Sequence, residues 1–210
     1  LFFTRKKNNF DTYFKKEILG NDAEEYINLS EKKIKDILPW AKKRIYWNNS
    51  QLKTKTNIAI IYIHGFSASM GEIRPVPDIL AKNLQANLYY SRLSGHGLTD
   101  EASLRNVDGK DWYYDIQEAF EIGYKIGDKI LVIATSFGCT LVSEYLSKTD
   151  KNNLILGNIF ISPCFGISDF RLLLGRYTWS KFLFQLFLGE ERKIGNRNPE
   201  EKKWWCNTYP

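Results

Sequence analysis

The sequence predicts an α/β protein with a mostly parallel sheet and helices on both faces. From residue 57 onward, short apolar runs rich in β-branched residues alternate with longer amphipathic segments. This alternation is typical of strand–helix–strand units joined by right-handed crossovers. The apolar runs are nearly continuous, which is typical of strands covered on both faces. The predicted strands span residues 58–63, 87–93, 129–133 and 154–161, and the predicted helices span residues 76–85, 110–126 and 139–146.

The segments on either side of this pattern have a different character. Residues 4–20 are polar and basic and form a predicted arm, whereas residues 22–38 have helical spacing up to Pro39. Residues 44–47 predict an edge strand. Residues 170–188 are rich in Leu, Phe and Trp, which indicates helical material that could cover a pocket mouth. We therefore divide the chain into a basic N-terminal arm and helix (1–43), an α/β core (44–165) and the start of a cap region (166–210).

The longest predicted helix, residues 110–126, has one apolar face. Trp112, Ile116, Phe120 and Gly123 share that face, which we expect to pack on the sheet. The acidic side chains of the segment are expected elsewhere on the helix: Asp111, Asp115, Glu118 and Glu121.

A serine stands at the junction of the third predicted strand and its helix. The strand 129–133 runs directly into Ala134-Thr135-Ser136-Phe137-Gly138, and the helix follows. Small residues two positions before and after the serine fit a tight turn, where neighbouring backbones approach closely. Such a turn pushes the Ser136 oxygen outward and leaves the Phe137 N–H at a helix start, free to bind an anion. This geometry suits a nucleophile.

Charge and composition limit the classes of partner. The 210 residues are enough for one well-cored domain, and the apolar content of 43% predicts a globular protein. The net charge is +6, and residues 1–56 hold 13 Lys/Arg against 7 Asp/Glu, whereas the remaining residues hold 17 of each. Because the core has no basic excess, we expect no nucleic-acid partner. The sequence predicts no particular oligomeric state.

Neither a metal site nor a cofactor site is predicted. The three cysteines lack C-x-x-C spacing, and the sequence has only two histidines, so a structural zinc site is not expected. No Gly-x-Gly-x-x-Gly or Walker loop follows a predicted strand. The cysteines are expected to be reduced and mostly buried thiols of a cytoplasmic protein: Cys139, Cys164 and Cys206.

Two segments leave contact with a membrane open. The chain starts with Leu1-Phe2-Phe3 before a basic run, which fits either an arbitrary start or the end of a membrane anchor that precedes Leu1. Residues 182–188 are rich in Phe and Leu and could bind an acyl chain or lie on a membrane surface. A cap helix packed on the core is an equal alternative for that segment.

Three loops are expected to meet at the carboxyl ends of the strands, where function collects in parallel sheets. They are His64-Gly65-Phe66, Gly95-His96-Gly97 and the Ser136 turn. Their order and spacing over residues 57–165 resemble the α/β-hydrolase fold, in its branch of serine esterases, monoacylglycerol lipases and lysophospholipases. The resemblance implies that Ser136 is the nucleophile, that the N–H groups of Phe66 and Phe137 form an oxyanion hole, and that the two loop histidines shape turns without acting in catalysis.

The chain departs from this family at two points. Ala134 replaces the first glycine of the usual Gly-x-Ser-x-Gly, and no histidine follows Ser136, although the family order is Ser, then Asp or Glu, then His. Asp169 could serve as an acid only in a variant arrangement. Two explanations are open: an N-terminal fragment of a longer hydrolase, incomplete after the beginning of its cap, or a binding protein that lost catalysis. The missing initiator Met and the missing later strands favour the fragment.

We therefore expect a serine-dependent carboxylic ester hydrolase that works through an acyl-enzyme. Its expected partner is a small apolar acyl ester, such as a monoglyceride or a lysophospholipid, and it needs no cofactor or metal. These 210 residues alone are expected to be nearly inactive, because a triad member is missing. The alternative is a non-catalytic binding or interaction protein on the same scaffold.

Overall fold

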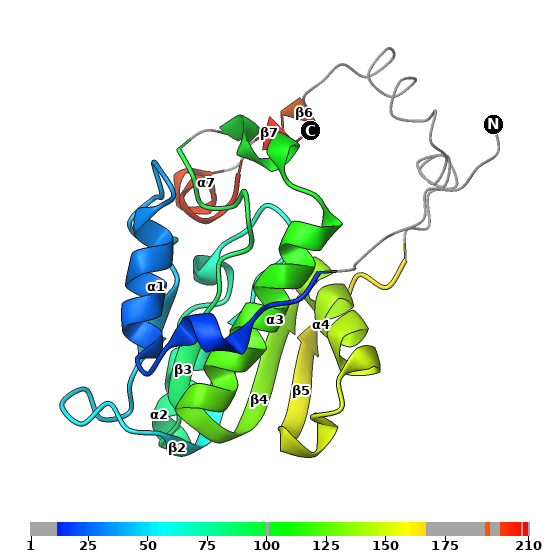
Figure 1. Ribbon diagram of the computed structural model, residues 1–210. Coiled ribbons are helices and arrows are strands. Elements are labelled where there is room, and N and C mark those ends of the chain that lie inside the picture. The colour runs from blue at the N-terminus through cyan, green and yellow to red at the C-terminus, as the bar shows by residue number, and fades with distance from the viewer. Residues whose placement is uncertain (1–11, 100, 167–191, 194–197, 207, 210) are drawn as a thin grey trace.

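The computed structural model describes residues 12–99, 101–166, 192–193, 198–206 and 208–209. A five-stranded sheet in the order β1-β3-β2-β4-β5 forms the centre of this part (Figure 1). Four strands run parallel, and the short edge strand β1 pairs antiparallel with β3. The predicted mostly parallel sheet is therefore confirmed. The strands are β1 (Arg44–Tyr46), β2 (Thr56–Ile63), β3 (Asn87–Tyr90), β4 (Gly127–Thr135) and β5 (Ile155–Ile161).

Helices cover both faces of the sheet, as expected. Figure 1 shows α3 and α4 in front of the strands, α2 behind them, and α1 beside α3. The main helices are α1 (Ala23–Lys32), α2 (Val76–Asn83), α3 (Gly109–Ile126) and α4 (Phe137–Lys148), and the short helices are η1 (Lys16–Leu19), η2 (Met70–Glu72), η3 (Glu101–Asn106), η4 (Asn152–Leu154) and α7 (Pro199–Trp204). A short ribbon of β6 (Arg192–Lys193) and β7 (Thr208–Tyr209) completes the described part.

Strand alternation divides the core into two layers. Ile61, Ile63 and Val132 point toward α3 and α4 and join the larger hydrophobic cluster. Their neighbours Ile60 and Tyr62 point to the other face and pack with α2 and η2. Because side chains in a strand alternate between faces, the nearly continuous apolar run of β2 supplies both layers.

Two elements are shorter than the sequence predicts. The helix predicted to reach residue 38 ends at Lys32, because the next N–H groups, those of Lys33 and Ile34, form tight three-residue turns with Ser30 and Glu31. The strand predicted to reach residue 93 ends at Tyr90. Beyond it the backbone bonds to side chains from distant segments: the Leu93 N–H donates to His64 and the Ser94 N–H donates to Asp115. The predicted cap helix and Asp169 lie outside the described residues.

The N-terminal segment packs on the core from residue 12 onward, although the sequence predicts an arm up to residue 20. The Phe14 side chain is buried between the rings of Tyr26 and Tyr114, with ring centroids 6.0 and 5.2 Å away. Its N–H donates to Gln117 Oε1 at 2.8 Å, and the Gln117 amide donates to the Thr12 carbonyl at 3.0 Å. The buried side chains of Phe14, Leu19, Ala23 and Ile27 therefore belong to the same core cluster as α3. Within the described part of the chain, each helix is too short or too polar to cross a bilayer.

Two glycines of the sheet differ sharply in their surroundings and allow a matched test. A Cβ added at Gly127 would lie 2.3 Å from the Ala59 nitrogen, whereas one added at Gly157 would meet nothing closer than the Leu131 side chain at 3.8 Å. Gly127→Ala must therefore shift β4 against β2, and we expect it to lower the free energy of unfolding by about 2 kcal/mol or more. Gly157→Ala should change it by less than about 0.5 kcal/mol. Urea denaturation of both variants checks this, and equal losses would contradict the observed register.

Candidate active site

Ser136 occupies a strained turn between β4 and α4. Its backbone has φ 50° and ψ −114°, a region that side-chain-bearing residues rarely adopt. Hydrogen bonds hold the turn on both sides: the Ser136 N–H donates to the Ile161 carbonyl at 2.9 Å, and the Ser136 carbonyl accepts from the N–H groups of Cys139 and Cys164, both at 3.1 Å. The Ser136 side chain does not cap α4. Its hydroxyl is therefore not used to stabilise the helix that follows.

The small residues around Ser136 have a steric cause. A Cβ added at Gly138 would lie 2.7 Å from the His64 carbonyl oxygen and 2.8 Å from the Ile63 carbonyl oxygen. The first turn of α4 therefore lies directly against the carboxyl end of β2. Ala134 is fully buried at the end of β4. Alanine in place of the family's glycine is accommodated here.

The loop after β2 touches the serine. A Cβ added at Gly65 would lie 3.3 Å from Ser136 Cβ, which is tighter than most Cβ contacts, so the two backbones approach closely here. The next residue, Phe66, has its ring 6.2 Å from the ring of Phe137, centroid to centroid. The structure thus places all three predicted site residues side by side. Their catalytic roles stay predictions.

Four rings pack together beside the Ser136 turn and are called the aromatic wall below: Phe66, His96, Trp112 and Phe137. The rings meet edge to face, with centroid separations from 5.2 Å for Trp112 and Phe137 to 6.2 Å for Phe66 and Phe137. Such arrangements are favourable for aromatic pairs. The Phe66 side chain is 37% exposed, so part of the wall faces solvent and can contact an apolar group.

Both histidines are fully buried, and their ring nitrogens are engaged. His64 Nε2 accepts from the Leu93 N–H at 3.0 Å, and its Nδ1 lies 2.8 Å from the Gly65 carbonyl. His96 Nε2 accepts from the Ser67 N–H at 2.9 Å, and its Nδ1 lies 3.0 Å from the carbonyl of Ser94. Each ring therefore accepts at Nε2 and donates at Nδ1, which is the neutral form. This arrangement suits the turn-shaping role that the resemblance implies and leaves no ring nitrogen to take a proton from Ser136.

Burial keeps these rings neutral. It lowers the pKa of His96 to about 4, and burial together with the neighbouring His96 ring lowers the pKa of His64 well below its usual value. An imidazolium would lose its hydration here and could not accept a hydrogen bond at Nε2.

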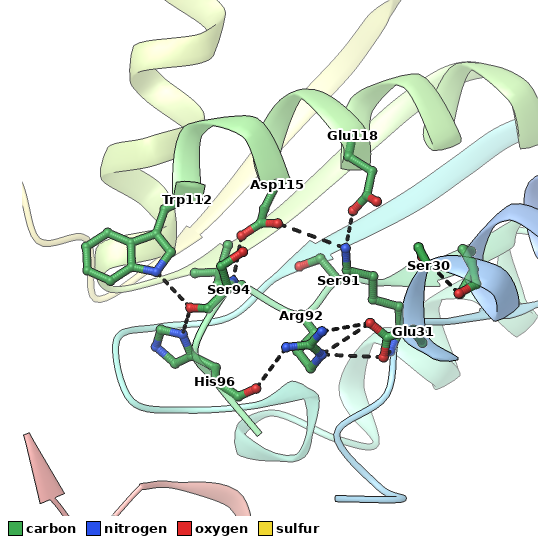
Figure 2. A network of polar contacts seen from close by, with 12 residues as sticks. Ser30, Glu31, Ser91, Arg92, Ser94, His96, Trp112, Asp115 and Glu118 are labelled. Carbon is green, nitrogen blue, oxygen red and sulfur yellow. Dashed lines mark hydrogen bonds and ion pairs between the residues drawn. The ribbon is translucent and has the colours of Figure 1, made fainter. Parts of the chain in front are cut away.

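A buried ionic network supports the loop after β3, which carries His96 (Figure 2). Arg92 pairs with Glu31 of α1 at 2.8 Å and donates to the His96 carbonyl at 3.1 Å. Beside them, Lys43 pairs with Glu118 and lies 3.9 Å from Asp115. Buried ion pairs of this kind demand full hydrogen bonding, because an unpaired buried charge is very costly. The network therefore holds the loop after β3 in one position.

The network corrects one expectation from the helical pattern. Asp115 and Glu118 are 5% and 2% exposed, although the pattern places them away from the packed face. Asp115 accepts from the Ser94 N–H at 2.5 Å and Glu118 from the Tyr26 hydroxyl at 2.7 Å. Burial raises the pKa of Asp115 to about 6, against the opposing charge of Lys43. The two acids are buried because they have partners from distant segments.

Glu72 is a further site residue that the sequence analysis missed. Its Oε1 accepts from the Gly65 N–H at 2.6 Å and from the Tyr62 hydroxyl at 2.7 Å. Burial raises the pKa of its carboxyl group. The only signal for Glu72 in the sequence is its position shortly after the His-Gly-Phe loop. Glu72 thus fixes the start of the loop that carries Phe66.

Among the described side chains, no group of three or more His, Cys, Asp or Glu is arranged to hold a metal ion.

The buried histidines predict how stability depends on pH. The pKa of His96 is about 4 in the folded protein and about 6.5 in the unfolded chain, so its contribution is complete above pH 6.5 and is lost as the pH falls toward 4. We expect that loss to be on the order of 3 kcal/mol, and His96→Gln should remove it. Asp115, with its raised pKa, acts in the opposite direction, so Asp115→Asn should steepen the loss. Urea midpoints between pH 4.5 and 7.5 check both, and an unchanged slope in His96→Gln would contradict the neutral ring.

The contacts of Glu72 predict a stability difference between two substitutions. Glu72→Leu leaves the Gly65 N–H and the Tyr62 hydroxyl without their acceptor, and we expect it to cost about 2 kcal/mol or more. Glu72→Gln keeps an acceptor oxygen and should cost less than half of that. Glu144→Gln, in an exposed pair with Lys148, is the control and should cost at most about 0.5 kcal/mol. Thermal unfolding measures all three. A Glu72→Leu variant as stable as the control would mean that the carboxylate does not hold the loop.

Comparison with known proteins bears on the fold. No family model and no curated protein matches this sequence. Among solved structures, a chain from the study of LipS and LipT, two metagenome-derived lipolytic enzymes, is 19% identical with a TM-score of 0.61, over 77% of this chain and 59% of its own. The monoacylglycerol lipase of Paleococcus ferrophilus is 17% identical with a TM-score of 0.50, over 79% of this chain and 64% of its own. This chain thus spans less than two thirds of either structure. The chain has the α/β-hydrolase fold.

Proposed function

We propose that this chain carries the nucleophile and the oxyanion hole of a serine hydrolase for carboxylic esters with apolar acyl groups. One observation carries the proposal: Ser136 stands in a strained turn at the start of α4, in contact with Gly65 of the loop that precedes Phe66. Backbone strain of this kind persists only where the surroundings enforce it, and it clusters at active sites.

The chemistry follows from this placement. Ser136 Oγ would attack the ester carbonyl carbon, the alcohol would leave, and water would later release the acid. Negative charge builds on the carbonyl oxygen in the transition state. The N–H of Phe137, in the first turn of the 12-residue helix α4, and the N–H of Phe66 are suited to bind it. Loss of one such donor typically costs about 3–4 kcal/mol of transition-state stabilisation.

The surroundings favour an apolar acyl group. The aromatic wall offers ring edges and faces beside Ser136, and Phe66 is exposed enough to meet a substrate. The two similar structures come from lipolytic enzymes and a monoacylglycerol lipase, which supports the same substrate class. A monoglyceride or a lysophospholipid fits this description.

One observation favours a second candidate, a binding protein on the same scaffold. The only two histidines of the sequence are His64 and His96, and the ring nitrogens of both are engaged in the turns. We therefore assign the base of the triad to neither histidine, and its acid to no residue in the described part of the chain. Without a base, a serine is a weak nucleophile.

A phosphonylation experiment separates the two candidates. The chain is treated with a fluorophosphonate, with and without added imidazole, and the modified peptide is identified by mass spectrometry. Ser136 attacks phosphorus, fluoride leaves, and imidazole takes the proton. We expect modification at Ser136, with a rate that rises roughly tenfold in imidazole, because the free base substitutes for the missing side chain.

Two variants control this experiment. Ser136→Ala should abolish the modification, whereas Ser162→Ala, which alters an exposed serine just after β5, should leave it unchanged. Modification spread evenly over several serines, or no modification of Ser136 even with imidazole, would favour the binding protein.

A further inference from the structure

A cavity lies beside the loop that carries Phe66. It measures about 300 Å³, within the range of small-ligand pockets. Its walls come from four segments: residues 38–41, residues 67–69, residues 97–99 and residues 203–206 at the end of α7. Ser136 and Phe137 are not among the lining residues. The cavity is therefore separate from the proposed nucleophile, but it shares the loop after β2 with it.

Hydrogen bonds fix the α7 wall to the core. The Trp40 indole N–H donates to the Lys203 carbonyl at 2.7 Å, and the Ser69 hydroxyl donates to the Trp204 carbonyl at 3.0 Å. The Cys206 N–H donates to the Ser67 carbonyl at 2.6 Å. These three bonds join residues 203, 204 and 206 to two core segments, residues 38–41 and 67–69. The walls are thus already in place before any ligand enters.

Close packing supports the same wall. A Cβ added at Gly71 would lie 1.9 Å from the Trp204 ring, so the indole packs closely against a residue without a side chain. This packing prevents Trp204 from moving toward Gly71.

The lining combines apolar surface with the positive charge of a lysine. Leu38, Trp40, Ala68, Leu98 and Trp204 supply apolar surface. Serine and threonine hydroxyls supply polar atoms, and Lys203 is the one charged residue among the lining residues that the structure describes. Since none of these described residues is acidic, the lysine gives this lining a preference for an anion. The Lys203 ammonium lies 5.1 Å from the centre of the Trp204 ring, which places the charge next to apolar surface.

We propose that this cavity binds a small amphiphilic carboxylate, with an apolar chain against the tryptophan rings and a carboxylate beside Lys203. The inference goes beyond the proposed ester hydrolysis and does not depend on the reactivity of Ser136. Its ligand would touch Ser67, whose N–H holds His96 and whose carbonyl holds Cys206. A bound ligand would therefore contact Ser67, the residue next to Phe66.

The test measures binding and no ester turnover, so its failure is distinct from failure of the hydrolase proposal. Octanoate, octanol and octylamine are titrated into the protein at pH 7.5 by calorimetry. We expect one saturable site that binds octanoate about threefold more tightly than octanol, as one exposed ion pair would give, and octylamine least. Absence of saturable binding, or equal affinity for octanoate and octanol, would overturn the proposal.

Three variants locate the site. Thr99→Trp fills the mouth from an exposed position and should weaken octanoate binding at least tenfold. Lys203→Gln should remove the preference for octanoate over octanol. Lys42→Gln alters an exposed lysine outside the lining and should change neither. Unchanged binding in Thr99→Trp would place the ligand elsewhere and overturn the proposal.

A second measurement needs no substitution. Cys206 lines the cavity, whereas Cys164, equally half-buried, does not. Saturating octanoate should slow alkylation of Cys206 by iodoacetamide severalfold and leave Cys164 unaffected. Equal effects on both thiols, or none on either, would contradict the proposed location.

Discussion

The site depends on one close approach, between the carboxyl end of β2 and the first turn of α4. Gly138 lies against the carbonyl oxygens of Ile63 and His64, and Gly65 lies against Ser136. A side chain at Gly138 would push the helix away from the strand, and the Phe137 N–H would move away from the loop. The strained backbone of Ser136 follows from the same constraint, because the chain must turn from strand to helix within one residue. Packing of two glycines therefore sets the geometry that any chemistry here requires.

The loop that carries Phe66 is held from three directions by polar contacts. Glu72 binds its first N–H, at Gly65, and His96 binds the N–H of Ser67, which follows Phe66. The Cys206 N–H binds the Ser67 carbonyl from the other side. Donors at an oxyanion site are effective only if they are fixed before the charge appears, since reorganisation would consume the gain. The fixed loop would meet that condition for the proposed oxyanion hole, and the neutral state of His96 contributes to it.

The sequence predicts the sheet well because its signals are local. Apolar β-branched runs define β2, β4 and β5, and small residues flanking Ser136 indicate a tight turn. The ionic network could not be predicted from the sequence. Acidic residues off the apolar face of a helix are expected to be exposed, and the partners that bury Asp115 and Glu118 are not visible in the helix itself. Those partners arrive from segments distant along the chain, with Lys43 preceding β1 and the Tyr26 hydroxyl coming from α1. Periodicity describes one helix, whereas burial of a charge depends on several elements.

The same reasoning connects the N-terminal helix to the site. Glu31 of α1 neutralises Arg92, and Arg92 in turn binds the His96 carbonyl and so fixes the ring that receives the Ser67 N–H. A buried arginine without its carboxylate would be destabilising, so the loop after β3 keeps this position only while α1 is docked. The first segment of the chain is thus part of the support of the Phe66 loop, although none of its residues lies in the aromatic wall. Together with the contact from Cys206, this makes the loop a junction of segments from both ends of the described chain.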